Sequence, residues 1–135
     1  MTTLKAVLLG LLIPGVLVAA AAAPAWELVG AVGLLRVVYV EPSHIKDTRF
    51  LADVVSQMYA KFGKEQAMQI DFFDDRDAAP KTVPYTSAQR RHQRAKFNFN
   101  PKNGMQRFVW LDLVPVPNDP TKLRIKETEE KLPLP

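Results

Sequence analysis

The chain has 135 residues, which is enough for one domain of ordinary size and too few for two. It holds no cysteine and only two histidines, which excludes disulfide frameworks, thiol nucleophiles, thiolate metal centres and a zinc site made mainly of histidines. The formal net charge of +4 permits an anionic partner without requiring one.

The N-terminal segment has the pattern of an export signal. One positive charge, Lys5, precedes an uncharged run from Ala6 to Ala25, and Ala23-Pro24-Ala25 forms a small-x-small cleavage site. We predict that residues 1–25 are a signal peptide, with an uncleaved signal-anchor as the alternative because the run is long enough to cross a bilayer. Either outcome is extracytoplasmic: the domain is periplasmic or secreted after cleavage, or anchored in the inner membrane without it.

The next residues predict a strand followed by the main helix. Leu34–Val40 is largely apolar on both faces, as expected for a strand covered on both sides. Beyond a break, apolar residues recur at spacings of one, three and four up to Phe62, which indicates an amphipathic helix. Asp47 is placed to cap the start of this helix, and Gly63 is placed to end it.

Three more strands are predicted beyond the helix. Met68–Phe73 alternates apolar and polar residues, and with the preceding strand and helix it predicts a parallel βαβ unit. Ser87–Arg94 is polar and predicts two exposed helical turns. Ala95–Asn100 and the run through Trp110 alternate around the turn Asn103-Gly104, which predicts a β-hairpin.

The predicted fold is therefore α+β, with one main helix packed on a small mixed sheet of about four strands in the order β-α-β-β-β. The apolar signal or anchor helix precedes it, and the domain spans residues 34–113. Residues 114–135 are predicted to be a Pro-rich charged tail, most of it mobile. Within this tail, Leu123 and Ile125 are compatible with a short edge strand.

Four carboxylates gather at the C-terminal end of a predicted strand: Asp71, Asp74, Asp75 and Asp77. Strand ends are frequent ligand sites in α/β proteins, and calcium and magnesium prefer clustered carboxylate oxygens, so these residues are a candidate metal site. Their spacing departs from the calcium-loop pattern. The alternative is that Asp71 faces solvent or pairs with an arginine, while Asp74 and Asp75 start a turn.

A basic segment follows, and it contains Arg90, Arg91, His92, Arg94 and Lys96 without any acidic residue. These side chains are candidates for contact with phosphate, lipid headgroups or an acidic protein surface. The segment lacks interleaved aromatic residues that stack on bases, and the protein is predicted to be exported, so nucleic acid is not an expected partner. The alternative is a solvated basic helix that pairs in part with the acidic cluster.

A combination of local patterns runs from Leu35 to Trp110. It comprises the first strand, the capped helix and four short segments: Phe72-Phe73-Asp74-Asp75, His92 to Ala95, Asn98 to Asn100 and Gly104 to Phe108. In these patterns the chain resembles small uncharacterised α+β domains of bacterial exported proteins and lipoproteins. It differs from the lipoprotein members in lacking the lipid-bearing cysteine. Because such domains have no assigned activity, the resemblance implies fold and location only.

Two functions of different classes follow from these patterns. The first is a non-enzymatic exported domain that uses no cofactor and binds another envelope protein, or another anionic partner, through Arg90 to Lys96. This protein contacts the membrane if the N-terminal segment is retained. The alternative is a small hydrolase or divalent-metal-dependent enzyme that uses Asp71 to Asp77 and His92. An enzyme needs these groups to converge in a concave, partly desolvated pocket, so their placement distinguishes the two functions.

Overall fold

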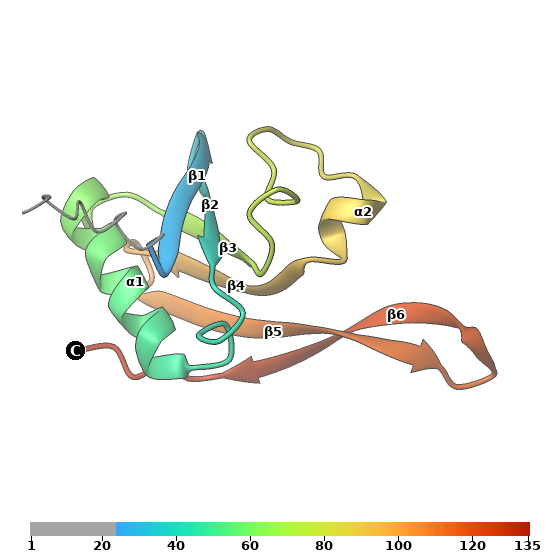
Figure 1. The fold of residues 1–135 in the computed structure, drawn as a ribbon. Helices are drawn as coiled ribbons and strands as arrows, with labels where there is room; N and C mark the ends of the chain where they lie inside the picture. Colours follow the sequence, from blue (N-terminus) through green and yellow to red (C-terminus); the bar gives the residue numbers. More distant parts are fainter. Residues whose placement is uncertain (1–23) are drawn as a thin grey trace, which may run out of the picture.

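The computed structural model describes residues 24–135, whose arrangement is shown in Figure 1. The predicted signal peptide or anchor, residues 1–25, lies almost entirely outside this range. Among the described residues, no helix is long and apolar enough to cross a membrane. The described chain forms six strands and two helices: β1 Trp26–Val32, β2 Leu35–Val40, α1 Thr48–Phe62, β3 Met68–Phe73, α2 Ser87–Arg90, β4 Gln93–Asn100, β5 Met105–Val116 and β6 Asp119–Glu130.

All six strands form one sheet in the order β1-β2-β3-β4-β5-β6, so each strand lies beside its neighbours in the sequence. β2 and β3 are parallel and are connected by α1, and the other pairs are antiparallel. The predicted parallel βαβ unit is therefore confirmed. The predicted hairpin between β4 and β5 is also confirmed, and Gly104 in its turn has a φ of 71°, a conformation that glycine adopts without strain.

Helix α1 begins and ends at the residues that the sequence predicts. The Asp47 carboxylate accepts hydrogen bonds from the backbone N–H groups of Arg49 and Phe50, at 3.0 and 3.2 Å. At the other end, the N–H of Gly63 donates to the carbonyl of Tyr59 at 2.8 Å. The buried side of the helix packs on one face of the sheet, here called the first face, through Leu51, Val54, Val55 and Met58.

The main core lies between α1 and the first face of the sheet. Phenylalanines from three adjacent strands supply much of its volume: Phe72, Phe97, Phe99 and Phe108. Leu132, which follows β6, is 5% exposed and belongs to the same cluster. The C-terminal residues therefore complete the core, and Figure 1 shows the chain ending beside α1.

The predicted arrangement of one helix and four strands is wrong, because the sheet has an additional strand at each edge and a second, short helix is present. The first additional strand, β1, lies between the predicted signal and the predicted domain. Its residues continue the apolar composition of residues 6–25 with one charge, Glu27, so no change in pattern marks the strand. Gly33, with a φ of 57°, makes the tight turn from β1 into β2.

The other additional strand, β6, replaces most of the predicted tail. The prolines of this stretch favour a tail over a strand, because each lacks a backbone donor. However, β5 continues through Pro115 and pairs with β6 from Phe108 to Val116. β4 pairs with β5 only as far as Trp110, so one side of β5 carries no ladder beyond that point, and proline is tolerated there. Figure 1 shows this part of the β5–β6 hairpin, residues 111–127, projecting from the body; it is called the arm below.

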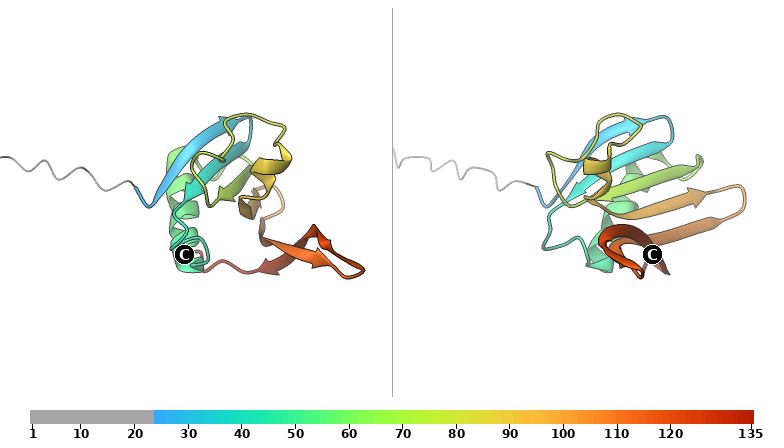
Figure 2. Two further views of the ribbon diagram at one scale, coloured as in Figure 1. Left: turned by 45° about the vertical axis from the view of Figure 1, so that its right-hand side comes forward. Right: turned by 90° about the vertical axis from the view of Figure 1, so that its right-hand side faces the viewer.

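The second face of the sheet, opposite α1, is covered over β1, β2 and β3 by residues 74–86. This covering segment contributes to a small second cluster in which Val37, Phe73 and Ala79 are buried. In Figure 2 the segment and α2 lie on the side of the sheet away from α1. Helix α2 is a single short turn, because β4 already begins at Gln93 within the stretch that predicted a second turn. Over β4, β5 and β6 the second face is hollowed instead.

Candidate functional site

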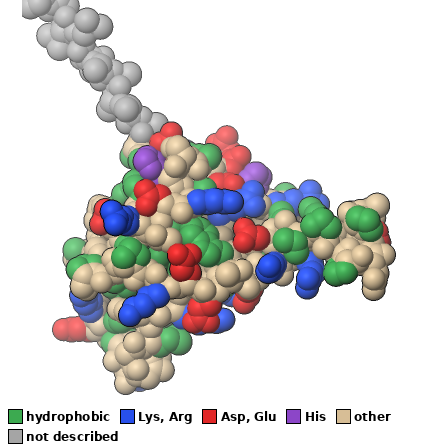
Figure 3. Space-filling model, turned by 90° about the horizontal axis from the view of Figure 1, so that it is seen from below, with side chains coloured by type: hydrophobic (Ala, Val, Ile, Leu, Met, Phe, Trp, Pro, Cys, Tyr) green, Lys and Arg blue, Asp and Glu red, His purple; other side chains and the backbone are tan. Residues whose placement is uncertain are grey.

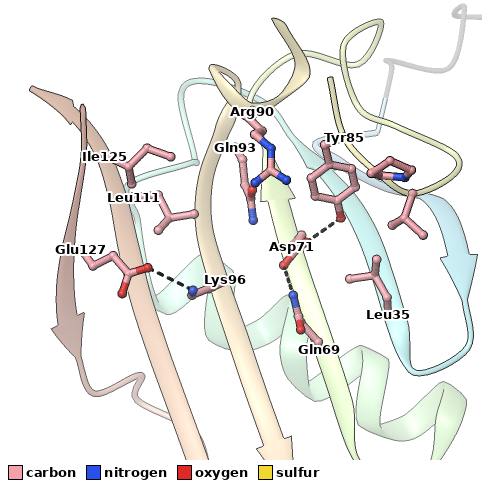
Figure 4. A pocket seen from close by; sticks show the side chains of 12 residues that line it. Leu35, Gln69, Asp71, Tyr85, Arg90, Gln93, Lys96, Leu111, Ile125 and Glu127 are labelled. Carbon is pink, nitrogen blue, oxygen red and sulfur yellow. Dashed lines mark hydrogen bonds and ion pairs between the residues drawn. The ribbon is translucent and has the colours of Figure 1, made fainter. Parts of the chain in front are cut away.

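A cleft of about 540 Å³ opens on the second face, between the covering segment and the arm (Figure 4). Its polar side chains come mainly from β3, β4, α2 and β6, and its apolar walls come from β2, the covering segment and the arm. The polar lining includes Gln69, Asp71, Arg90, Gln93, Lys96 and Glu127, and the apolar walls include Leu111 and Ile125. Residues that are far apart in the sequence thus meet in one concave surface.

Asp71 lies at the floor of the cleft and is 2% exposed, and no other charged residue in the described range is buried. The Tyr85 hydroxyl donates to its Oδ2 at 2.5 Å, and the Gln69 amide donates to its Oδ1 at 3.0 Å. Burial raises the pKa of the Asp71 carboxyl, while the two hydrogen bonds and the charges of Lys96 and Arg90 oppose the rise. The carboxyl is therefore neither solvent-facing nor paired with an arginine.

Tyr85 holds the covering segment on the sheet. Its ring packs edge-on against Phe73 at 5.4 Å between centroids, and its hydroxyl reaches the Asp71 carboxylate. Burial and the bond to Asp71 both raise the pKa of Tyr85, so the phenol remains protonated and acts as the donor. The Asp71–Tyr85 pair thus fixes one wall of the cleft.

The basic segment divides into side chains that are paired and side chains that are available. His92 Nδ1 and Arg94 Nε contact the two oxygens of Asp74, at 2.9 and 2.7 Å. Lys96 Nζ contacts Glu127 Oε1 at 3.1 Å. Arg90 and Arg91 are exposed and form no ion pair within residues 24–135. Of the five predicted partner-binding residues, these two offer their charge most directly to a partner.

A groove of about 550 Å³ runs between α2 and the arm and continues the cleft, because Arg90 and Ile125 line both hollows. Its lining combines basic and apolar side chains: Arg90, Arg91 and Lys122 with Leu113, Leu123 and Ile125. Leu123 is 56% exposed and Ile125 is 45% exposed, which is high for branched apolar side chains that stand side by side. Figure 3 shows apolar and basic side chains together on the arm.

The predicted acidic cluster is distributed over separate places. Asp71 lies in the cleft, whereas Asp74 holds His92 and Arg94. The Asp75 carboxylate accepts from the backbone N–H groups of Asp77 and Ala78, at 2.9 and 3.1 Å, and so stabilises a turn. Asp77 lines a different hollow, beside β1. In the range 24–135, no three His, Asp or Glu side chains are grouped so as to hold a metal ion.

Several residues of the cleft and groove were not among the predicted site residues. Glu127, Leu123 and Ile125 belong to the stretch that was assigned to the tail, although its alternation of charged and apolar residues was visible in the sequence. Gln69 and Gln93 carry no sequence signal of their own. Strand alternation places Gln69 on the same face as Asp71, opposite α1. Gln93 reaches that face through a register shift between β3 and β4, which sets it opposite Phe73.

Comparison of the chain with models of protein families, with curated proteins and with solved structures gives no match. The function of the protein must therefore be inferred from the chemistry of the cleft and the groove.

Proposed function

We propose that this protein is an exported, non-enzymatic domain that binds an acidic segment of another envelope protein in the groove between α2 and the arm. The proposal is based on the composition of the groove. Three cationic side chains, Arg90, Arg91 and Lys122, border three apolar ones, Leu113, Leu123 and Ile125. This combination fits a partner segment in which carboxylates and apolar side chains are interleaved.

The two kinds of side chain contribute differently to such binding. Exposed cations attract an acidic partner over several ångströms and orient its approach, but each exposed ion pair contributes little affinity. The apolar side chains supply affinity, because contact with the partner removes Leu123 and Ile125 from water. The volume of the groove, about 550 Å³, lies within the range of about 300–1,000 Å³ that is usual for ligand pockets.

The enzymatic alternative has no comparable support. His92 pairs with Asp74, and neither of them lines the cleft that contains Asp71. A hydrolytic or metal-dependent centre would require these groups to converge on one reacting atom. We therefore keep partner binding as the single proposed function.

The proposal is tested with a short fluorescent peptide of alternating Glu and Leu, whose binding is followed by anisotropy. We expect the double variant R90Q/R91Q to weaken binding by about tenfold. The matched control K46Q/R49Q removes the same charge from exposed residues near the start of α1 and is expected to change binding little. Equal losses in both variants, or no binding to the unmodified protein, would contradict a specific site in the groove.

Two further peptides separate the contributions of charge and apolar contact. A Lys/Leu peptide keeps the apolar residues and reverses the charge, whereas a Glu/Ser peptide keeps the charge and removes the apolar residues. Both are expected to bind more weakly than the Glu/Leu peptide, since the groove offers both kinds of contact. Equal binding of the Glu/Ser peptide would mean that Leu123 and Ile125 take no part.

The proposed location is tested separately. The protein is expressed from its full reading frame, and its intact mass and membrane fractionation are measured. A mass that begins near Trp26 in the soluble extracytoplasmic fraction supports a cleaved signal peptide. Full mass in the membrane pellet, resistant to high salt and released by detergent, supports the signal-anchor. Full mass in the cytoplasm would contradict export.

A further inference from the structure

Lys96 is a cation of the cleft whose carboxylate partner comes from the edge of the sheet. The Lys96 ammonium lies 3.1 Å from Glu127 Oε1, with side-chain exposures of 25% and 47%. In the sheet register, Lys96 is opposite Val109 of β5, and Glu127 is opposite Leu111 of the same strand. Glu127 therefore reaches diagonally across β5 to contact an ammonium that is fixed in the middle of the sheet.

A carboxylate of a bound partner could take the place of the Glu127 carboxylate. Arg90 extends from α2 into the same cleft, and Figure 4 shows Lys96 between Asp71 and Glu127. Both oxygens of Asp71 are already engaged by Tyr85 and Gln69. Glu127, in contrast, is half exposed and makes one contact, with Lys96, so it is the replaceable carboxylate of this cleft.

From this geometry we infer that Glu127 is an internal competitor, which occupies the Lys96 ammonium in the free protein and is displaced by a carboxylate of the bound partner. The inference rests on the proposed function, since the same acidic segment supplies the displacing group. The segment that lies in the groove reaches the cleft past Arg90 and Ile125, which line both. Lys96 then acts as a second anchoring cation beside Arg90.

The displacement should require little free energy. Half-exposed ion pairs contribute weakly to stability because water screens them and because two long side chains must be held in one geometry. Removal of the competitor should therefore tighten binding of the Glu/Leu peptide by about two- to fivefold.

The test compares Glu127→Gln with Glu129→Gln. Glu129 lies on the same strand and the same face, two residues further on, and pairs with Arg107 outside the cleft, at 3.4 Å. Both variants remove one negative charge, so a general electrostatic effect would tighten binding equally in both. We expect E127Q to bind the Glu/Leu peptide about two- to fivefold more tightly than E129Q does. In a Lys96→Met background, E127Q should no longer improve binding beyond E129Q.

The outcomes separate this inference from the proposed function. If the unmodified protein binds the Glu/Leu peptide and E127Q gains no more than E129Q, the competitor role is refuted while the groove remains. If the gain persists in the Lys96→Met background, competition for Lys96 is likewise refuted. If neither the unmodified protein nor E127Q binds the peptide, the proposed function fails and the inference fails with it.

Discussion

Replacement of Tyr85 by Phe should destabilise the protein in a pH-dependent way. The change removes one oxygen and leaves the ring, which packs against Phe73. It deprives the buried Asp71 carboxyl of a donor at 2.5 Å, and the Gln69 amide remains as the only side-chain donor. Hydrogen bonds to charged groups contribute about 1.5–3 kcal/mol, so we expect a loss of about 2 kcal/mol in the free energy of unfolding at neutral pH.

The pH dependence follows from the direction of the Asp71 shift. Burial raises the pKa of this carboxyl in the folded state above its unfolded value. Its contribution to stability is therefore complete below the unfolded pKa and is lost as the pH rises through the folded pKa. Without the Tyr85 hydroxyl the folded pKa rises further, so the variant loses more stability at neutral pH. At acidic pH the deleted bond joins two neutral groups, and the loss falls to about 1 kcal/mol.

Urea unfolding followed by tryptophan fluorescence, at about pH 4 and about pH 7, measures both values. The control is Tyr39→Phe, which deletes the same atom. The Tyr39 hydroxyl has no side-chain partner in the described residues, and its ring contacts Arg76. This control should change the free energy of unfolding by less than about 0.5 kcal/mol. If Tyr85→Phe behaves like this control, or if its loss is the same at both pH values, the account of the Asp71–Tyr85 pair is refuted.

Three further stability predictions use the same urea unfolding. Asp47→Ala should cost about 1 kcal/mol because it removes the cap of α1, and an unchanged midpoint would contradict that role. Gly30→Ala should cost about 1–3 kcal/mol, since its Cβ would lie 3.1 Å from Lys81 Cα of the covering segment; a neutral result would mean that the segment can move aside. Leu132→Ala should cost about 2–4 kcal/mol because Leu132 is buried in the main core, whereas a mobile tail predicts no loss.

The parts of the fold that sequence predicted are those with local signals. The cap at Asp47, the helical spacing of apolar residues and the glycine at residue 63 all lie within one stretch of chain, and together they define α1. The turn at Gly104 is equally local. The edge strands have weaker local signals. β1 shares its composition with the apolar N-terminus, and it was not predicted. β6 is exposed along almost its whole length, and only a short edge strand at Leu123 and Ile125 was considered there. Pairing with a neighbour, rather than burial, defines an edge strand.

The candidate site was only partly predictable for the same reason. The sequence identified the basic segment. Which of its cations are available depends on carboxylates that are distant in the chain, such as Glu127, which pairs with Lys96. Strand alternation placed Asp71 on the face of β3 away from Ile70 and Phe72. Its burial arises from the covering segment, and no local pattern shows where that segment lies.

If charge in the groove selects an acidic partner segment, inversion of that charge should invert the selection. The variant R90E/R91E is titrated with the Glu/Leu and Lys/Leu peptides in parallel with the unmodified protein. The unmodified protein should prefer the Glu/Leu peptide and the variant should prefer the Lys/Leu peptide, because the apolar contacts are shared and only the sign of the charge changes. An unchanged preference for the Glu/Leu peptide in the variant would contradict binding in the groove.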